Sequence, residues 1–260
     1  MSELLKASNL TFAYGERVAL REVSVSLAPG QLVGILGPNG SGKSTLIRTL
    51  FGQLHARSGS IEWDEKPIDA WRRRDLARRV AYLPQSPSAD PDQTVLDVLR
   101  LGRAPYWHAF GIESEHDEVV VRRVCSQLAL DDLLARPISD LSGGQRQRVF
   151  VGRCLVQEPA ALLLDEPSTF LDLRHQLELF RMLRMLATDK SIGVLIASHD
   201  LNLAAMFCDR LMLLREGAVA AEGPPADVLR ADVIESVFDV QMETLHTADA
   251  RPIVVPRVIT

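Results

Sequence analysis

"GILGPNGSGKST", residues 34–45, decides how the rest of the chain is interpreted. Residues 37–44 match G-x-x-x-x-G-K-[ST] at every fixed position. The preceding residues 31–36 form a nearly continuous aliphatic run, which predicts a strand buried on both faces. From Lys43 onward, apolar residues recur at helical spacing: Leu46, Ile47, Leu50 and Phe51. The pattern therefore predicts a strand, a glycine-rich loop and a helix.

The composition of this loop suits a polyphosphate. Backbone N–H groups that curl around phosphates need glycine where a Cβ would clash or φ must be positive, and a helix N-terminus adds partial positive charge. Lys43 would place its ammonium on the terminal phosphates, and the Ser44 hydroxyl would bind Mg²⁺. The alternative is a flexible turn with an incidental lysine. We expect a nucleotide, held by Gly37, Pro38, Asn39, Gly40, Ser41, Gly42, Lys43, Ser44 and Thr45.

Two acids follow a second aliphatic run, in LLLDEP at residues 162–167. Asp165 and Glu166 would lie at the carboxyl end of a strand, where ligands bind in open α/β sheets. Asp165 is suited to hold Mg²⁺ through water, and Glu166 to accept a hydrogen bond from the water that attacks the terminal phosphate. A lone Asp-Glu pair is more often a helix cap or turn, but the phosphate loop favours a catalytic site.

Composition limits the classes of protein. The 260-residue chain carries a formal net charge of −5, so it lacks the basic character of most nucleic-acid-binding domains, and we expect no nucleic-acid partner. Its 3 cysteines show no paired spacing, which argues against a disulfide framework or a zinc site. No stretch reaches the ~18 apolar residues of a membrane-spanning helix. We therefore expect a globular chain that does not cross a bilayer.

The wider pattern predicts an α/β fold, a parallel sheet flanked by helices with an inserted helical subdomain. Further strands are expected near residues 4–10, 18–27, 160–164 and 192–197. Helices are expected near residues 95–101, 118–130, 144–155 and 172–186. We predict that residues 1–87 and 158–222 form an ATP-binding core. Residues 88–157 would form the helical subdomain, and residues 223–260 a C-terminal extension.

The stretch LSGGQ at residues 141–145, followed by a predicted helix, resembles the signature of the nucleotide-binding subunits of ATP-binding cassette (ABC) transporters. The other motifs of that family occur in its order, over about residues 4–225: an A-loop aromatic residue, Tyr14; a Q-loop, Gln85 in YLPQ; a D-loop, STFLD at residues 168–172; and a switch histidine, His199. The resemblance implies a RecA-like P-loop NTPase core, an N-terminal antiparallel β subdomain, and ATP and Mg²⁺ as ligands.

The resemblance also implies roles. Glu166, His199 and Gln85 would be catalytic, while Ser44, Gln85 and Asp165 would hold the metal. Tyr14 would stack on adenine, since an aromatic face binds a base with little directional demand. Taken alone, these side chains have plainer interpretations: a strand tyrosine, a loop glutamine and a capped core histidine.

A second anion-binding turn is expected at Ser142, Gly143, Gly144 and Gln145. One triphosphate does not need two such turns from one chain, so the resemblance implies that this turn, with Asp172, serves the ATP of a second copy. Two copies would then enclose two ATP molecules as a homodimer. The alternative, a serine-capped helix after a flexible turn, predicts no dimer.

The stretches ARRVAYLPQ and VLRLGRAPY, with residues 223–260, are similar to bacterial importers of ferric siderophores, haem and cobalamin. This implies an ATP-hydrolysing subunit at the cytoplasmic face of the bacterial inner membrane. Its partners would be two membrane permease subunits and, indirectly, a periplasmic substrate-binding protein. The rival interpretation is a soluble ABC-type ATPase of DNA repair or cytosolic assembly. Residues 86–140 show neither sustained heptads nor a second phosphate loop, which disfavours the DNA-repair class.

Three local features leave alternatives open. The aromatic stretch 101–110 would either line a docking groove for a membrane partner or form the helical segment's own small core. The arginines at 72–74 and 78–79 would be a solvated helix face or a contact with anionic lipid. Phe170, in STFLD where SALD is commoner, is a candidate to alter contacts between the two copies.

Overall fold

A six-stranded sheet forms the centre of the computed structural model, which describes residues 3–107, 113–169, 171–248 and 250–257. Its strand order is β10-β9-β3-β8-β7-β6, and only β10 runs antiparallel to its neighbour. The strands are β3 (Leu32–Leu36), β6 (Val80–Leu83), β7 (Ala161–Asp165), β8 (Gly193–Ala197), β9 (Arg210–Arg215) and β10 (Ala218–Gly223). Phe110 and Phe170 lie outside the described residues.

Each central strand divides its side chains between two hydrophobic cores, because successive side chains point to opposite faces of a sheet. In β3, Leu32 and Leu36 pack into one core, while Val33 and Ile35 pack into the other. All residues of β3, β7 and β8 are buried. The aliphatic runs in the sequence are thus explained, and the predicted strands at these places are confirmed.

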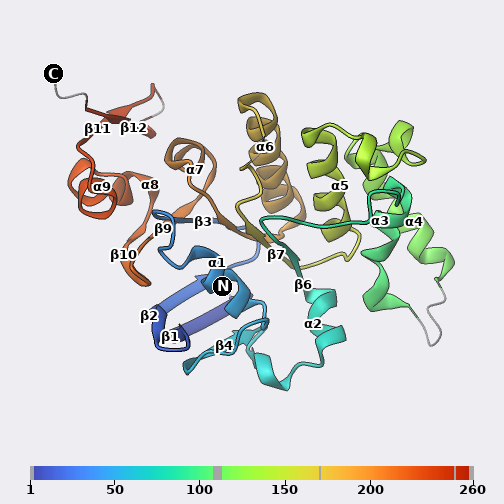
Figure 1. Ribbon diagram of the computed structural model, residues 1–260, viewed down its shortest axis with the longest axis horizontal. Coiled ribbons are helices and arrows are strands. Elements are labelled where there is room, and N and C mark those ends of the chain that lie inside the picture. Colours follow the sequence, from blue (N-terminus) through green and yellow to red (C-terminus); the bar gives the residue numbers. More distant parts are fainter. Residues whose placement is uncertain (1–2, 108–112, 170, 249, 258–260) are drawn as a thin grey trace.

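A second, antiparallel sheet covers one face of the central sheet, with α1 (Lys43–Leu50) between the two (Figure 1). Its order is β2-β1-β4-β5, formed by β1 (Leu5–Tyr14), β2 (Arg17–Leu27), β4 (Ser58–Trp63) and β5 (Lys66–Pro67). The buried side of α1 contributes Leu46, Ile47 and Leu50 to the core of this face. The expected N-terminal antiparallel sheet is confirmed, and α2 (Arg73–Arg79) follows it in the chain.

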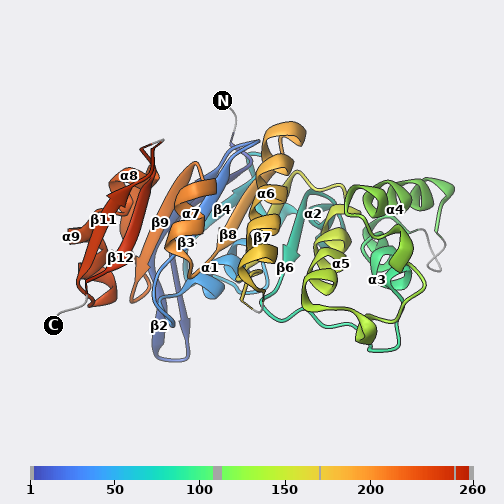
Figure 2. The same cartoon turned by 90° about the horizontal axis from the view of Figure 1, so that it is seen from above.

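Helices α5 (Gly143–Leu155), α6 (Leu173–Lys190) and α7 (Leu201–Phe207) lie on the opposite face of the central sheet. Together with α3 (Val95–Leu101) and α4 (Glu115–Gln127), α5 forms one end of the molecule (Figure 2). The predicted helix at 118–130 is misplaced by three residues at each end. Ser114 and Asp117 form a capping box that starts α4 earlier, and Ala129 adopts φ +51° beyond its end. The α/β class with a parallel sheet flanked by helices is confirmed.

The carboxyl-terminal residues form a hairpin at the opposite end of the molecule from α3 and α4 (Figures 1 and 2). It comprises β11 (Met242–His246) and β12 (Pro252–Pro256), and follows α8 (Pro225–Val228) and α9 (Ala231–Phe238). The side chain of Asn202, in α7, pairs with the backbone of Val254: its amide donates to the carbonyl at 3.2 Å, and its oxygen accepts from the N–H at 2.8 Å. This two-point contact fastens the hairpin to α7.

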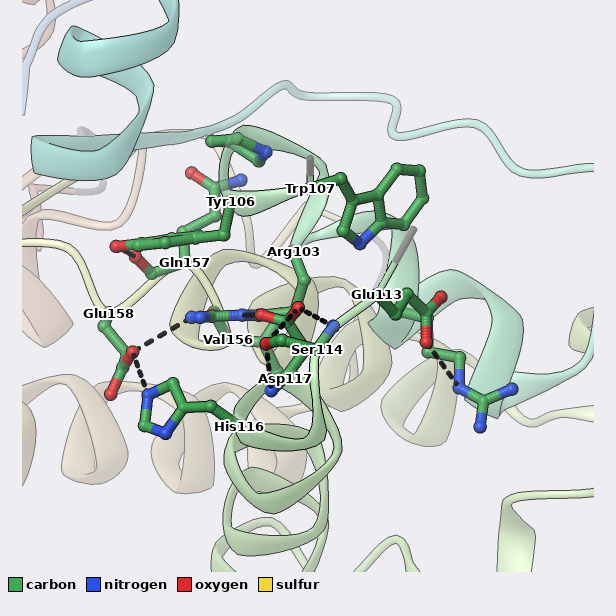
Figure 3. Close-up of polar contacts among 12 residues, drawn as sticks. Arg103, Tyr106, Trp107, Glu113, Ser114, His116, Asp117, Val156, Gln157 and Glu158 are labelled. Carbon is green, nitrogen blue, oxygen red and sulfur yellow. Dashed lines mark hydrogen bonds and ion pairs between the residues drawn. The ribbon is translucent and has the colours of Figure 1, made fainter. Parts of the chain in front are cut away.

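A buried arginine holds α3, α4 and the residues after α5 together (Figure 3). The side chain of Arg103 is 1% exposed; its Nε lies 2.7 Å from Oδ1 of Asp117, and Nη1 donates to the carbonyl of Val156 at 2.6 Å. Its guanidinium also lies 3.8 Å from the ring centroid of Tyr106, whose hydroxyl donates to the carbonyl of Gln157 at 2.9 Å. Among the described residues of the aromatic stretch, Tyr106 therefore belongs to this segment's own interior.

The arginines of α2 are partly committed to the same segment. Arg78 donates through Nε to the carbonyl of Pro105 at 2.9 Å, and Arg74 binds the carbonyls of Pro105 and Trp107. The predicted solvated face is confirmed for Arg72, Arg73, Arg74 and Arg79, which are exposed, whereas Arg78 is half-buried. Arg74 and Arg78 nevertheless tie α2 to the turn Ala104–Tyr106. Across the described residues, no helix combines the length and apolarity needed to cross a bilayer.

Candidate functional site

The loop between β3 and α1 lies close to neighbouring backbone. A Cβ on Gly37 would lie 2.2 Å from the carbonyl oxygen of Leu214, and one on Gly42 would lie 2.7 Å from that of Ala19. Both glycines also have positive φ, +145° and +108°, which disfavours any other residue. Gly42 is the N-cap of α1, where no side chain supplies a capping hydrogen bond. The amino end of α1 is therefore available to an anionic ligand.

Lys43 is folded back over this loop. Its side chain is 4% exposed, and its Nζ donates to the carbonyls of Gly37 at 2.9 Å and Pro38 at 3.2 Å. The same atom lies 3.5 Å from Oε1 of Glu166. The ammonium thus lies between the loop that would hold a phosphate and the acid that would activate water.

Ser44 and Asp165 meet beneath the loop. The Ser44 hydroxyl donates to Oδ1 of Asp165 at 2.7 Å, and Asp165, the last residue of β7, is 0% exposed. Burial raises the pKa of the Asp165 carboxyl, although the hydrogen bond from Ser44 opposes that rise. Its Oδ2 is buried and has no hydrogen-bond partner among the described residues. A carboxylate oxygen left in this state fits the hydration shell of a divalent cation such as Mg²⁺.

Glu166 is held by two neighbours in addition to its contact with Lys43. Its Oε2 accepts from Nε2 of Gln85 at 3.0 Å and from the Thr169 hydroxyl at 3.3 Å. The backbone of Glu166 has φ +48°, a left-handed conformation that is uncommon outside glycine. Gln85 follows β6, which pairs directly with β7, so sheet topology brings these two side chains together.

An open cleft of ≈ 930 Å³ unites most of the predicted nucleotide-site residues. Its walls include Tyr14, Asn39, Gly40, Gly42, Lys43, Ser44, Thr45, Gln85, Glu166 and His199. Tyr14 lies at the end of β1 with its ring edge-on to Phe12, and His199 follows β8. Asp165 does not line the cleft but lies beneath it through Ser44. Gly37, Pro38 and Ser41 are likewise absent from its walls.

Several cleft residues were not predicted from the sequence. They are Arg17, Val18, Ala19, Arg21, Thr169, Glu216 and Gly217. The turn between β9 and β10 supports the loop, because the N–H of Gly217 donates to the carbonyl of Ser41 at 3.0 Å. Glu216-Gly217 between two apolar runs is a readable hairpin signal, but nothing local indicates that this turn meets the phosphate loop. Thr169 lies three residues after Glu166, within the D-loop stretch at residues 168–172, but had not been assigned to the cleft.

The signature residues are not part of this cleft. Ser142 caps α5 in a reciprocal box with Gln145: the N–H of Gln145 lies 3.3 Å from the Ser142 hydroxyl, and the N–H of Ser142 lies 3.0 Å from Oε1 of Gln145. Gly143 and Gly144 form the first turn of the helix. In both views, α6 lies between α1 and α5 (Figures 1 and 2). Asp172, the N-cap of α6, is also outside the cleft.

Comparison with known proteins shows the family of the chain. Residues 5–169 match the family model described as ABC transporter. The chain belongs to the ABC transporter family. It is 42% identical over 249 residues to the hemin import ATP-binding protein HmuV of Bordetella parapertussis, covering 93% of this chain and 94% of that protein. It is 35% identical to the iron(3+)-hydroxamate import ATP-binding protein FhuC of Bacillus subtilis, covering 92% and 89%.

Solved structures of ABC proteins share the fold. An inward-facing ABC transporter described as of metal-chelate type superposes with a TM-score of 0.86 at 26% identity, covering 98% of both chains. A dimeric post-hydrolysis state of the cassette MJ0796, bound to ADP and Pi, superposes with a TM-score of 0.74 at 25% identity, covering 85% of this chain and 98% of that one. The ABC protein is thus an ATPase with the expected P-loop NTPase core.

Proposed function

We propose that this ABC ATPase powers import of chelated iron and that two copies enclose ATP between them. The observation that carries the shared ATP site is the separation of the two anion-binding turns within one chain. Lys43, Ser44 and Glu166 share one cleft, whereas Ser142 and its neighbours lie outside it. The turn at Ser142 would therefore bind a phosphate of the ATP held by a second copy.

In the cleft, ATP is bound by the residues that surround Lys43. Tyr14 offers an exposed aromatic face for the adenine, and the loop residues 37–45 supply backbone N–H groups for the phosphates. Lys43 then exchanges the carbonyls of Gly37 and Pro38 for phosphate oxygens. Its present position shows that the side chain already reaches the centre of the loop.

The metal role falls to Ser44, Gln85 and Asp165. Oδ2 of Asp165, which has no partner in the described part of the chain, would bind Mg²⁺ through water, and the Ser44 hydroxyl would ligate it directly. When bound, Mg²⁺ neutralises charge on the phosphate oxygens. The nearby Gln85 amide can turn from Glu166 toward the ion.

Glu166 is the proposed residue that orients the attacking water. Its carboxylate is fixed by Gln85, Thr169 and the Lys43 ammonium, so it can accept a water hydrogen in a defined direction. His199 faces the same cleft after β8 and would donate to the terminal phosphate. The arrangement supports in-line hydrolysis with most of the catalytic effect from positioning and charge.

The second copy contributes Ser142, Gly143, Gly144, Gln145 and Asp172 to each ATP. A crosslinking experiment tests this directly in a Glu166→Gln chain that carries Asn39→Cys and Ser142→Cys. All native cysteines are buried, so a short bismaleimide reacts mainly at the new thiols. We expect a covalent dimer with Mg-ATP and little without it, and none from either single-cysteine chain. Equal crosslinking with and without ATP contradicts the shared site.

The transport role includes partners beyond this chain: two membrane permease subunits and, through them, a periplasmic substrate-binding protein. The chain would lie at the cytoplasmic face of the bacterial inner membrane. Support comes from the two relatives, named for hemin and iron(3+)-hydroxamate import, and from the metal-chelate type transporter. Haem and ferric siderophores are therefore the proposed cargoes, ahead of cobalamin.

Pull-down of the tagged chain from detergent-solubilised host membranes tests the transport role. We expect a permease to copurify, and the reconstituted complex to hydrolyse ATP faster with a binding protein loaded with haem or a ferric hydroxamate. Stimulation by only one of them identifies the cargo. Recovery without any membrane subunit favours cytosolic assembly instead, and salt-sensitive DNA binding favours the repair class.

A further inference from the structure

The signature turn, residues 142–145, contacts one histidine of α6, His175. Gly144 is buried, and a Cβ on it would lie 2.3 Å from Cδ2 and 2.6 Å from Nε2 of His175. These distances leave no room for even a methyl group between the two residues. The first turn of α5 is therefore in direct contact with the His175 ring, which is 35% exposed.

The other side of the same ring holds the end of the D-loop. Nδ1 of His175 lies 2.8 Å from Oδ1 of Asp172, and that oxygen also accepts from the backbone N–H of His175 at 2.9 Å. Asp172 is the N-cap of α6, so its position is set by this pair of contacts. One side chain thus touches two segments that are assigned to the partner copy's ATP.

The chain between the acids and α6 is fastened at its beginning as well. The Thr169 hydroxyl donates to the carbonyl of Glu166 at 3.0 Å, and Nε2 of Gln176, next to His175, donates to the carbonyl of Ser168 at 3.2 Å. A series of direct contacts therefore runs from Glu166 through the start of α6 to Gly144. It connects the chain's own ATP cleft with its signature turn.

We propose that His175 is a positioning residue that couples the two ATP sites of the dimer. This inference rests on the proposed function, in which each copy's signature turn faces the ATP of the other copy. A displacement of Glu166 on ATP binding or hydrolysis would pass to α6, and the ring would pass it to Gly144 because the two residues are in direct contact. Occupancy of one site then alters the closure of the other.

The test compares three substitutions with a matched control. His175→Ala removes both contacts, His175→Phe keeps a ring beside Gly144 but loses the bond to Asp172, and His175→Asn keeps a donor for Asp172 but loses the ring. The control is Arg174→Ala, because the adjacent Arg174 is 84% exposed and pairs only with Glu178 among the described residues.

Steady-state hydrolysis is measured against ATP concentration in the full-length chain. We expect a sigmoidal response in the native chain and the control, with a Hill coefficient that approaches the two-site limit of about 2. All three His175 variants should respond hyperbolically, with kcat about tenfold lower. The affinity of the dilute single chain for a fluorescent ATP analogue should differ less than twofold between each variant and the native chain.

Three results overturn the proposal: a hyperbolic native response, retained sigmoidality in any His175 variant, or nucleotide affinity that falls in parallel with kcat. The ATP-dependent crosslink between Asn39→Cys and Ser142→Cys separates this failure from that of the proposed function. If the crosslink forms while cooperativity is insensitive to His175, only the coupling role is lost. If the crosslink is absent in the chain with His175 intact, the shared site itself is refuted.

Discussion

Ser44 Oγ lies 2.7 Å from Oδ1 of Asp165 and joins the first turn of α1 to the end of β7. The hydrogen bond satisfies one carboxylate oxygen of Asp165 and leaves Oδ2 without a partner among the described residues. A buried carboxylate whose second oxygen lacks a partner lowers the folding stability of the chain without a cation. The same oxygen is available as a ligand when a cation binds. This pair therefore predicts a conflict between stability and activity.

Asp165→Asn should raise the stability of the nucleotide-free chain while it abolishes turnover. Burial raises the pKa of Asp165, so the ionised form is disfavoured in the folded state and its cost grows as pH rises through the folded pKa. At pH 7 the neutral amide should increase Tm by about 2 °C or more. The gain should vanish below the unfolded pKa of about 3.9. Thermal unfolding from pH 3 to 8 checks this, and a gain that does not depend on pH contradicts it.

Glu166→Gln should keep ATP binding and lower kcat by about 100-fold or more, because the amide accepts a water hydrogen far less well than the carboxylate. The variant should also form a long-lived dimer with Mg-ATP, measured by size-exclusion chromatography. Glu178→Gln, on the outer side of α6, provides an isosteric control that should hydrolyse normally. Undiminished hydrolysis by Glu166→Gln would remove this residue from its proposed role.

Gly144→Ala should destabilise the chain, because its methyl group would lie 2.3 Å from His175 Cδ2. Overpacking of this kind costs about 1–3 kcal/mol, or roughly 2–10 °C in Tm. The double variant Gly144→Ala, His175→Ala should recover most of that loss, since the smaller residue leaves space for the methyl group. Unfolding in urea measures all four corners of this cycle. Additive effects would show that this contact carries no energetic coupling between the two residues.

Arg103→Met should reduce the free energy of unfolding by about 3 kcal/mol or more, because it leaves the buried Asp117 without its cation (Figure 3). Burial opposes ionisation of Asp117, but hydrogen bonds from Ser114 and Arg103 outweigh it and lower its pKa. Their contribution is present above the unfolded pKa of about 3.9 and is lost as pH falls through the folded pKa. In Arg103→Met the acid loss should begin at higher pH.

Urea unfolding at pH 7 and pH 5 measures the effect of Arg103→Met. Arg122→Met is the control on α4, the helix that carries Asp117, since Arg122 forms an exposed pair with Glu118 and its loss should change stability little. The double variant Arg103→Met, Asp117→Leu should recover much of the stability, because it removes both buried charges together. No recovery would mean that the arginine acts by packing alone.

Sequence reasoning located the local parts of the site well. The strand, loop and helix around residues 31–50 were predictable because hydrophobic periodicity and loop chemistry lie within one short stretch. The start of α4 was misplaced although Ser114-x-x-Asp117 is itself a readable capping signal. That error came from following the apolar residues alone.

Contacts between distant elements were not predictable. The support of the phosphate loop by Gly217 joins residues 176 positions apart, and the seating of Gly144 on His175 depends on how two helices pack. No periodicity or spacing carries that information. The same holds for Arg74 and Arg78, whose charges suggested a solvated face but whose partners are carbonyls of another segment.

The left-handed backbone at Glu166 has a consequence for laboratory evolution. A non-glycine residue at φ +48° costs on the order of 1 kcal/mol, which glycine would avoid. A library selected only for thermal tolerance should therefore enrich Glu166→Gly. The recovered variants would have higher thermal stability but would no longer hydrolyse ATP. Screens for robust versions of this ATPase need to select for turnover at the same time.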